Sequence, residues 1–206
     1  MNVIDKKMIN SPLYGEIQHR IRKKMQRMFG FDEWHVNSMY EKKYLPEIYK
    51  VLEALPDECK KKAFVEVGCG LGDIIGNIRT KGKKYGLDVS AEVINAAQIL
   101  HRDVVFHMGS FEDIHVNEEI GCLIMVNFIH ALSPESLKKH ILNIMSNHKV
   151  LYVLFDTDDR IKYSEYLFTH IGNDFLGEEY NCVFVGQNHI AAHGAYEHIE
   201  LWKCNR

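Results

Sequence analysis

Three glycines, at positions 68, 70 and 72, follow an apolar run in this 206-residue chain. The run, from Phe64 to Val67, is typical of a buried strand, and glycines let the backbone turn tightly and bring its N–H groups close to a ligand. The spacing therefore predicts a strand, a binding loop and then a helix from about Leu71 to Thr80. An acid, Asp88, ends the next predicted strand, where a carboxylate can accept hydrogen bonds from both hydroxyls of a ribose. Together these residues indicate a nucleoside-binding site.

The loop Glu66-Val-Gly68-Cys-Gly70-Leu-Gly72 resembles the acid-x-Gly-x-Gly-x-Gly loop of the class I S-adenosylmethionine (SAM) dependent methyltransferases. The competing interpretation is a nicotinamide or flavin site, which requires G-x-G-x-x-G. Asp73 stands where that pattern has its third glycine, and a carboxylate would sit badly beside a pyrophosphate. SAM carries no phosphate and its sulfonium is positive, so the spacing favours SAM.

The resemblance implies a set of cofactor contacts. Glu66 would help to position the methionine amino group, and Asp88 would hold the ribose. Ser110 stands where the family usually presents an acid to the adenine, and Phe111 would pack on that ring. The other residues that the resemblance assigns to the cofactor are Gly68, Cys69, Gly70, Val89, Asn127 and Phe128.

The stretch after the fourth predicted strand, from Met125 to Pro134, resembles the family's loop beside the transferable methyl group. It has neither the Asn/Asp-Pro-Pro-aromatic form of base-amine methylases nor a Pro-Cys pair, and it is most similar to enzymes of small metabolites. There His130 would face the acceptor. An imidazole is largely neutral at pH 7, and a positioned general base is typically worth about 10² to 10⁴ in rate. The alternative is a histidine that only bonds backbone.

Two helices are predicted before the glycine loop. Ile17, Ile21, Met25 and Met28 recur at helical spacing between Leu13 and Phe29, surrounded by arginine and lysine. Asn37-Ser38 could cap a second helix that runs to about Leu55. In the family this position commonly forms a lid, so we expect residues 1–58 to be a helical lid and 59–206 to be the SAM-binding domain. The aromatic candidates for contact with the acceptor, each of which could instead be a core residue, are Tyr14, Trp34, His35 and Tyr40.

Predicted strands and helices alternate from Phe64 to about Phe155, which indicates an α/β fold with parallel strands and helices on both faces. Ser90 and Ser133 are predicted helix caps along this stretch. A helix is also predicted from Tyr163 to about Ile171. Two later strands, near 181–186 and 196–202, have no helix between them and should pair antiparallel. This matches the family's Rossmann-like, seven-stranded, mostly parallel sheet with an antiparallel last strand.

Two histidines, His189 and His193, lie between the last two predicted strands. At i, i+4 they could share a helical face and bind a metal, but no glutamate follows His189 as the H-E-x-x-H pattern requires. We therefore predict no metal site. A hairpin loop whose histidines contact the acceptor is the favoured interpretation.

Composition narrows the class of protein. A net charge of −3 gives no overall attraction to nucleic acid or to an anionic membrane, although the basic helix near Arg22 leaves RNA as an alternative partner. Five cysteines form no CxxC pair, and no run of roughly 18 apolar residues could span a membrane. We expect a cytoplasmic protein with a small-molecule acceptor, and we allow for a homodimer.

The combined prediction is SAM-dependent methyl transfer to a small molecule, with S-adenosylhomocysteine as coproduct. We expect O-methylation of a sugar, a nucleotide-activated precursor of a surface polysaccharide, or a secondary metabolite. Two other classes remain open. One is an RNA or protein methyltransferase with a continuous basic groove, and the other is a non-catalytic subunit with the same fold.

Overall fold

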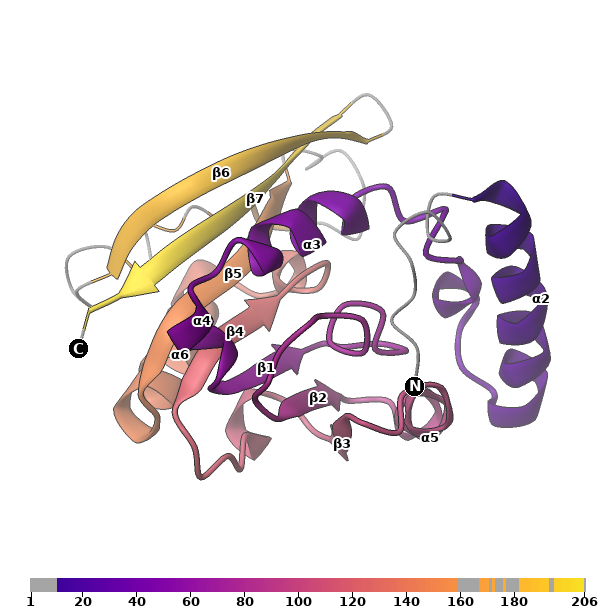
Figure 1. The fold of residues 1–206 in the computed structure, drawn as a ribbon, viewed down its shortest axis with the longest axis horizontal. Helices are drawn as coiled ribbons and strands as arrows, with labels where there is room; N and C mark the ends of the chain where they lie inside the picture. Colours follow the sequence, from indigo (N-terminus) through magenta and orange to yellow (C-terminus); the bar gives the residue numbers. More distant parts are fainter. Residues whose placement is uncertain are drawn as a thin grey trace.

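The computed structural model describes residues 11–158, 167–170, 172, 176, 182–192 and 195–205. Helices come first along the chain, and the strands follow, several of them with helices between them (Figure 1). The α-helices are α2 (Pro12–Phe29), α3 (Leu45–Glu53), α4 (Asp57–Lys60), α5 (Ala91–Leu100) and α6 (Pro134–Asn147). The 3-10 helices are η1 (Glu33–Val36), η2 (Phe111–Asp113) and η3 (Ile129–Ala131). The strands are β1 (Ala63–Val67), β2 (Lys84–Asp88), β3 (Val105–Met108), β4 (Ile120–Met125), β5 (Val150–Asp158), β6 (Cys182–Ala192) and β7 (Ala195–Cys204).

The strands form one seven-stranded sheet in the order β3-β2-β1-β4-β5-β7-β6. The first five strands are parallel, with the pairs β1–β2, β2–β3, β1–β4 and β4–β5. β7 is inserted antiparallel between β5 and β6, so the prediction of an antiparallel last strand is confirmed. Because parallel strands end at the same edge of a sheet, the loops after β1, β2, β3 and β4 meet at one edge.

Two apolar cores lie on opposite faces of the sheet. Phe64 of β1 packs in one core with residues of α3 and α5. Its neighbour Val65 packs in the other core with residues of α6. β1 and β4 are buried along their whole length, as expected for parallel strands covered on both faces. The predicted helices on both faces of the sheet are therefore confirmed.

The predicted helix from Leu71 to Thr80 is wrong, because residues 70–77 form a series of turns. Gly72 has a left-handed backbone, with φ of 80°, which interrupts a regular helix. The carboxylate of Glu66 also accepts a hydrogen bond from Ile75 N at 2.9 Å, so a side chain rather than a helical carbonyl satisfies that donor.

The predicted second helix also begins later than expected, at Leu45 rather than after Asn37-Ser38. Pro46 stands in its first turn, where the missing N–H costs nothing, whereas a helix that began near Ser38 would place the proline in its interior. Ser38 nevertheless has a capping-like role, because its N–H and hydroxyl both donate to the carboxylate of Glu41.

α2 exposes most of the apolar stripe that was expected to face the core. Ile17, Ile21 and Met28 are 48%, 49% and 66% exposed. The buried side chains of the helix include Arg22 and Met25 instead. Figure 1 shows α2 beside α5, on the opposite side of the molecule from the β6–β7 hairpin. The Arg22 face of α2 is buried, rather than the isoleucine face, because of the partner of Arg22 described with the site below.

The predicted helix from Tyr163 to Ile171 lies largely outside the described residues. Its described part, 167–170, has neither helical nor strand structure. Among the described residues, no helix is long and apolar enough to cross a bilayer.

Candidate functional site

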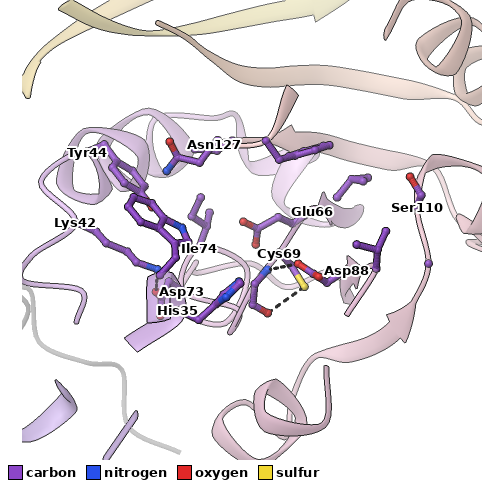
Figure 2. Close-up of a pocket in the computed structure, with 18 residues that line it drawn as sticks. His35, Lys42, Tyr44, Glu66, Cys69, Asp73, Ile74, Asp88, Ser110 and Asn127 are labelled. Carbon is purple, nitrogen blue, oxygen red and sulfur yellow. Dashed lines mark hydrogen bonds and ion pairs between the residues drawn. The ribbon is translucent and has the colours of Figure 1, made fainter. Parts of the chain in front are cut away.

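A cavity of about 260 Å³ opens where the loops after β1, β2, β3 and β4 meet (Figure 2). In Figure 2, Glu66, Asp88 and Ser110 follow one another across the cavity, while Lys42 and Tyr44 from the N-terminal segment close its other side. The residues that line it are Trp34, His35, Lys42, Tyr44, Glu66, Val67, Gly68, Cys69, Gly70, Asp73, Ile74, Asp88, Val89, Gly109, Ser110, Val126, Asn127 and Phe128.

The glycine loop packs so tightly that side chains are excluded. Gly68 and Gly70 have φ of 67° and 52°, values that residues with a Cβ rarely adopt. A Cβ at Gly68 would lie 2.5 Å from the ring of Phe128, and one at Gly70 would lie 3.1 Å from the ring of His35. The glycines therefore allow both aromatic side chains to approach the loop backbone.

The Asp88 carboxylate is fixed at the end of β2 by two backbone donors. Gly70 N donates to Oδ2 at 2.9 Å, and Ser90 N donates to Oδ1 at 3.0 Å. Each carboxylate oxygen can accept more than one hydrogen bond, so both retain capacity for a ligand's hydroxyl groups. The side chain thus joins the glycine loop to the start of α5 while it faces the cavity.

Glu66 is a buried acid at the cavity floor, 3% exposed. Burial raises the pKa of Glu66 well above its usual range, and the nearby Asp73 carboxylate raises it further. Oε2 accepts the hydrogen bond from Ile75 N. A carboxyl group with a raised pKa can hold a proton until a cation takes its place.

Asp73 ties the N-terminal segment to the glycine loop. Lys42 Nζ lies 2.8 Å from Asp73 Oδ2, and the Arg22 guanidinium binds both carboxylate oxygens, with Nη1 at 3.1 Å from Oδ2. Burial alone would raise the pKa of Asp73, but the charges of Arg22 and Lys42 outweigh it and hold the pKa below its usual value. This buried ion triad turns the Arg22 face of α2 inward.

A third buried acid, Asp156 near the end of β5, supports the loop after β4. Its Oδ1 accepts a hydrogen bond from Asn127 N at 2.9 Å, and its Oδ2 lies 3.2 Å from His130 Nε2. Asn127 has φ of 65°, unusual for a residue other than glycine. Asn127 Nδ2 is buried and has no hydrogen-bond partner among the described residues, so an amide donor beside the cavity is available to a ligand.

The structure gathers most of the predicted cofactor residues around this cavity. Phe111 is the exception, because it is 3% exposed and its ring stacks on His140 with centroids 4.7 Å apart. The predicted residues that do line the cavity are Glu66, Gly68, Cys69, Gly70, Asp88, Val89, Ser110, Asn127 and Phe128. Their binding roles stay predictions.

His130 does not line the cavity. Its ring is 1% exposed and lies against Asp156, in η3 behind Asn127. Its role as a base stays a prediction, and the geometry instead gives it a place in the support of the Asn127 loop.

Of the predicted acceptor contacts, Trp34 and His35 line the cavity and Tyr14 and Tyr40 do not. Tyr40 packs against Gly15 of α2, where a Cβ would lie 2.7 Å from the Tyr40 Cβ. The backbone of His189 lies in β6 opposite His198. The side chain of His189 and the whole of His193 lie outside the described residues.

His35 has a defined orientation. Its Nδ1 lies 2.8 Å from Asp32 Oδ1, and its backbone N–H donates to the same oxygen at 3.3 Å. A neutral imidazole whose Nδ1 donates to a carboxylate keeps its lone pair on Nε2. That nitrogen lies on the side of the ring that faces Gly70.

Sequence reasoning missed Lys42 and Asp156. Lys42 belongs to a Lys-Lys pair that resembles an ordinary solvated surface. Asp156 carried a signal, because an acid directly after the apolar run 150–155 marks the end of a buried strand at the edge where ligands bind. Among the described residues, no group of three or more His, Cys, Asp or Glu is arranged to hold a metal ion.

No protein-family model and no curated protein matches the sequence. Solved structures do match. Magnesium protoporphyrin IX methyltransferase from Synechocystis, with bound SAM, aligns over 100% of both chains at 13% identity and a TM-score of 0.64. The N-methyltransferase NodS from Bradyrhizobium japonicum, in complex with S-adenosylhomocysteine, aligns over 90% of this chain and 98% of its own at 11% identity, with a TM-score of 0.66.

A SAM-dependent methyltransferase from Clostridium acetobutylicum aligns over 94% of this chain and 100% of its own, at 14% identity and a TM-score of 0.60. The alignment with the Synechocystis enzyme covers the whole chain. At such low identity these likenesses establish architecture rather than activity. The chain has the Rossmann-like fold of the class I SAM-dependent methyltransferases.

Proposed function

We propose that this chain is a SAM-dependent methyltransferase that acts on a small-molecule acceptor. The observation that carries the proposal is the Asp88 carboxylate, held by the Gly70 N–H at the floor of a cavity at the carboxyl ends of the strands. A ribose bound there would find both carboxylate oxygens within the reach of its hydroxyls.

The charges around the cavity suit a cation better than a phosphate. Of the three acids that line the cavity, Asp73 is already paired with Arg22 and Lys42, so Glu66 and Asp88 are the acids that face a ligand. A pyrophosphate would be repelled by the Asp88 carboxylate, whereas the sulfonium and ammonium groups of SAM are positive. Glu66 would accept the ammonium, and Asn127 Nδ2, which has no partner among the described residues, would donate to an oxygen of the bound molecules.

Bound SAM would supply a methyl group, carried on a positively charged sulfur, for in-line transfer to a nucleophile. The residues of this chain then have to align the two reactants and keep water out. Trp34 and Tyr44 form a wall from the N-terminal segment, and Phe128 and Asn127 form one from the loop after β4. Asp156 fixes that loop through the Asn127 N–H.

The acceptor in this proposal is a small hydroxylated molecule, such as a sugar, a nucleotide-activated precursor or a secondary metabolite. Aromatic walls can pack on a sugar ring, and a hydroxyl must lose its proton as it is methylated. Of the two predicted imidazoles near the loops, His35 lines the cavity and His130 does not. His35 is therefore the better placed group to accept that proton.

The test is calorimetric titration of three proteins: the natural chain, Asp88→Ala and the control Asp57→Ala. Each is titrated with SAM and, separately, with S-adenosylhomocysteine. Asp57 is an exposed acid in the first turn of α4, away from the cavity. We expect binding to the natural chain and the control, and a loss of at least tenfold in affinity for Asp88→Ala. Equal affinity in all three proteins would remove the ribose assignment.

Turnover is then measured as S-adenosylhomocysteine release with nucleotide sugars and other hydroxylated small molecules. Release only with RNA or protein would favour the macromolecular alternative. One feature weakens that alternative, because Arg22 is buried against Asp73 and does not contribute to a basic groove.

A further inference from the structure

Two of the five cysteines lie sulfur to sulfur at the end of the sheet. Cys182 begins β6 and Cys204 ends β7, and the two residues are direct partners in the antiparallel ladder. Their sulfur atoms are 2.7 Å apart, and both are present as thiols. The pair lies at one end of the β6–β7 ladder, and the pair Ala192 and Ala195 lies at the other end.

Ladder partners have the backbone separation that a disulfide requires. Directly opposed residues in an antiparallel pair have Cα atoms roughly 4.5 to 5.5 Å apart, and disulfides span roughly 4.4 to 6.8 Å. A bond of about 2.05 Å therefore needs the sulfurs to move by a fraction of an ångström, which side-chain rotation can supply.

All five cysteines are buried, so the partner of each sulfur atom, and not its exposure, distinguishes this pair from the other three. The sulfurs of Cys59, Cys69 and Cys122 contact backbone carbonyl oxygens, of Gly121, Gly70 and Leu123 respectively. Burial raises the pKa of Cys59 to about 12 and raises the pKa values of Cys69 and Cys122 well above the usual range. Those three thiols are poor nucleophiles, because the thiolate is the reactive form.

We propose that Cys182 and Cys204 are a site of reversible disulfide formation that fastens the edge strand β6 to β7. The oxidant is a small disulfide of the glutathione type. One cysteine thiolate attacks a sulfur of the oxidant and releases one small thiolate, and the second cysteine thiolate attacks the mixed disulfide and releases the other. Two protein thiols are oxidised, the small disulfide is reduced to two thiols, and the two protons lost by the protein go to them.

The cross-link would act where the pairing of β6 is least secure. β6 is the last strand of the sheet, and its register with β7 shifts between Phe184 and Gly186. Val183, Phe184 and Val185, next to the cysteine, are 55%, 44% and 52% exposed. An edge strand with apolar side chains in solvent is prone to pair with other chains. A covalent bond at Cys182 fixes the register on one side of the bulge.

The test is to incubate the intact folded chain at pH 8 with glutathione disulfide or with reduced glutathione, and then to count its thiols. We expect five thiols, measured by alkylation after unfolding, in the reduced sample and three in the oxidised one. Peptide mapping should show Cys182 joined to Cys204. Closing a loop of this length should raise the melting temperature by roughly 5–10 °C.

Cys204→Ser should leave four thiols or a single mixed glutathione disulfide, without the rise in melting temperature. Cys59→Ala is the control, and it should still form the cross-link. Five thiols in the natural chain under oxidising conditions, or a disulfide between any other pair, would overturn the proposal. This measurement uses neither SAM nor turnover, so its outcome is independent of the proposed function.

Discussion

Asp73 holds two cations that come from different parts of the N-terminal segment, Arg22 in α2 and Lys42 before α3. All three side chains are less than a tenth exposed. Taking charges out of water is costly, and removing one partner from such a group leaves the others uncompensated. A substitution in the triad therefore tests whether these ion pairs hold the N-terminal segment against the glycine loop.

Asp73→Asn should destabilise the protein by about 3–5 kcal/mol, because two buried cations lose their counter-charge. The matched control is Glu58→Gln. Glu58 also pairs with a lysine, Lys61, but both side chains are more than half exposed, so its loss should change stability little. Urea unfolding of the three proteins checks this, and equal stability of the two variants would contradict the triad.

The triad also predicts acid sensitivity. The pKa of Asp73 is lower in the folded protein than in the unfolded chain. Its contribution to stability is therefore present above the unfolded pKa, about 3.9, and is lost as the pH falls through the folded pKa. The free energy of unfolding should fall with acidification below about pH 4, and less steeply in Asp73→Asn. Parallel profiles for the two proteins would count against the ion pairs.

Glu66 gives a second pH prediction, on binding rather than folding. Burial raises the pKa of Glu66, so part of the free protein holds a proton there at pH values where most carboxyls are ionised. An ammonium that takes its place must displace that proton. SAM affinity should therefore rise as the pH rises through the raised pKa, and Glu66→Gln should bind more weakly with a flat profile. Calorimetry in buffers of different ionisation enthalpy would detect the released proton.

His130 can be assigned by comparing two substitutions. If it positions the Asn127 loop through Asp156, His130→Ala should lower kcat, by about tenfold or more, while His130→Gln, which keeps a donor for Asp156, should recover most of it. If His130 is the general base, both variants should lose turnover equally and the acidic limb of the kcat profile should disappear. His35→Ala is the parallel variant for the residue that lines the cavity.

At the scale of elements, α2 shows how a contact distant in sequence overrides a local pattern. The spacing of Ile17 and Ile21 predicts a buried stripe, but the inward face is set by Arg22, whose partner is 51 residues away. No periodicity in the helix itself carries that information. Met25 is the one member of the predicted stripe that is buried, at 7% exposure.

α2 therefore makes a clear prediction for stability. Ile21→Ser should change the free energy of unfolding by no more than about 0.5 kcal/mol, because its side chain is already half exposed. Met25→Ala, one turn further along, should cost about 2–3 kcal/mol through the lost burial and the cavity left behind. Thermal or urea unfolding separates these outcomes, and a large loss for Ile21→Ser would mean that the exposed face is covered.

Other elements were predictable to different degrees. β2, α5 and α6 follow from apolar runs and from the caps at Ser90 and Ser133, whose side chains accept hydrogen bonds from Val93 N and Ser136 N. The sequence predicts a helix after the glycine loop, and its replacement by turns could not be foreseen. The Glu66 carboxylate takes the hydrogen bond of Ile75 N, and the left-handed backbone of Gly72 interrupts the helix. Local patterns identify elements that local interactions stabilise.

At the scale of the whole molecule, the topology was the most predictable feature. Alternating strands and helices allow few arrangements, and the two final strands without a helix between them require antiparallel pairing. The same rule brings Gly68, Asp88, Ser110 and Asn127 to one edge of the sheet, because parallel strands end there together. Lys42, Tyr44 and Asp156 join the site only through tertiary packing.

The central claim is that this fold binds SAM at Asp88. The most direct measurement is calorimetric titration of the natural chain and Asp88→Ala with SAM and, separately, with NAD. We predict micromolar binding of SAM to the natural chain, a loss of at least tenfold in affinity for Asp88→Ala, and no binding of NAD. Binding of NAD in place of SAM, or SAM affinity that does not depend on Asp88, would contradict it.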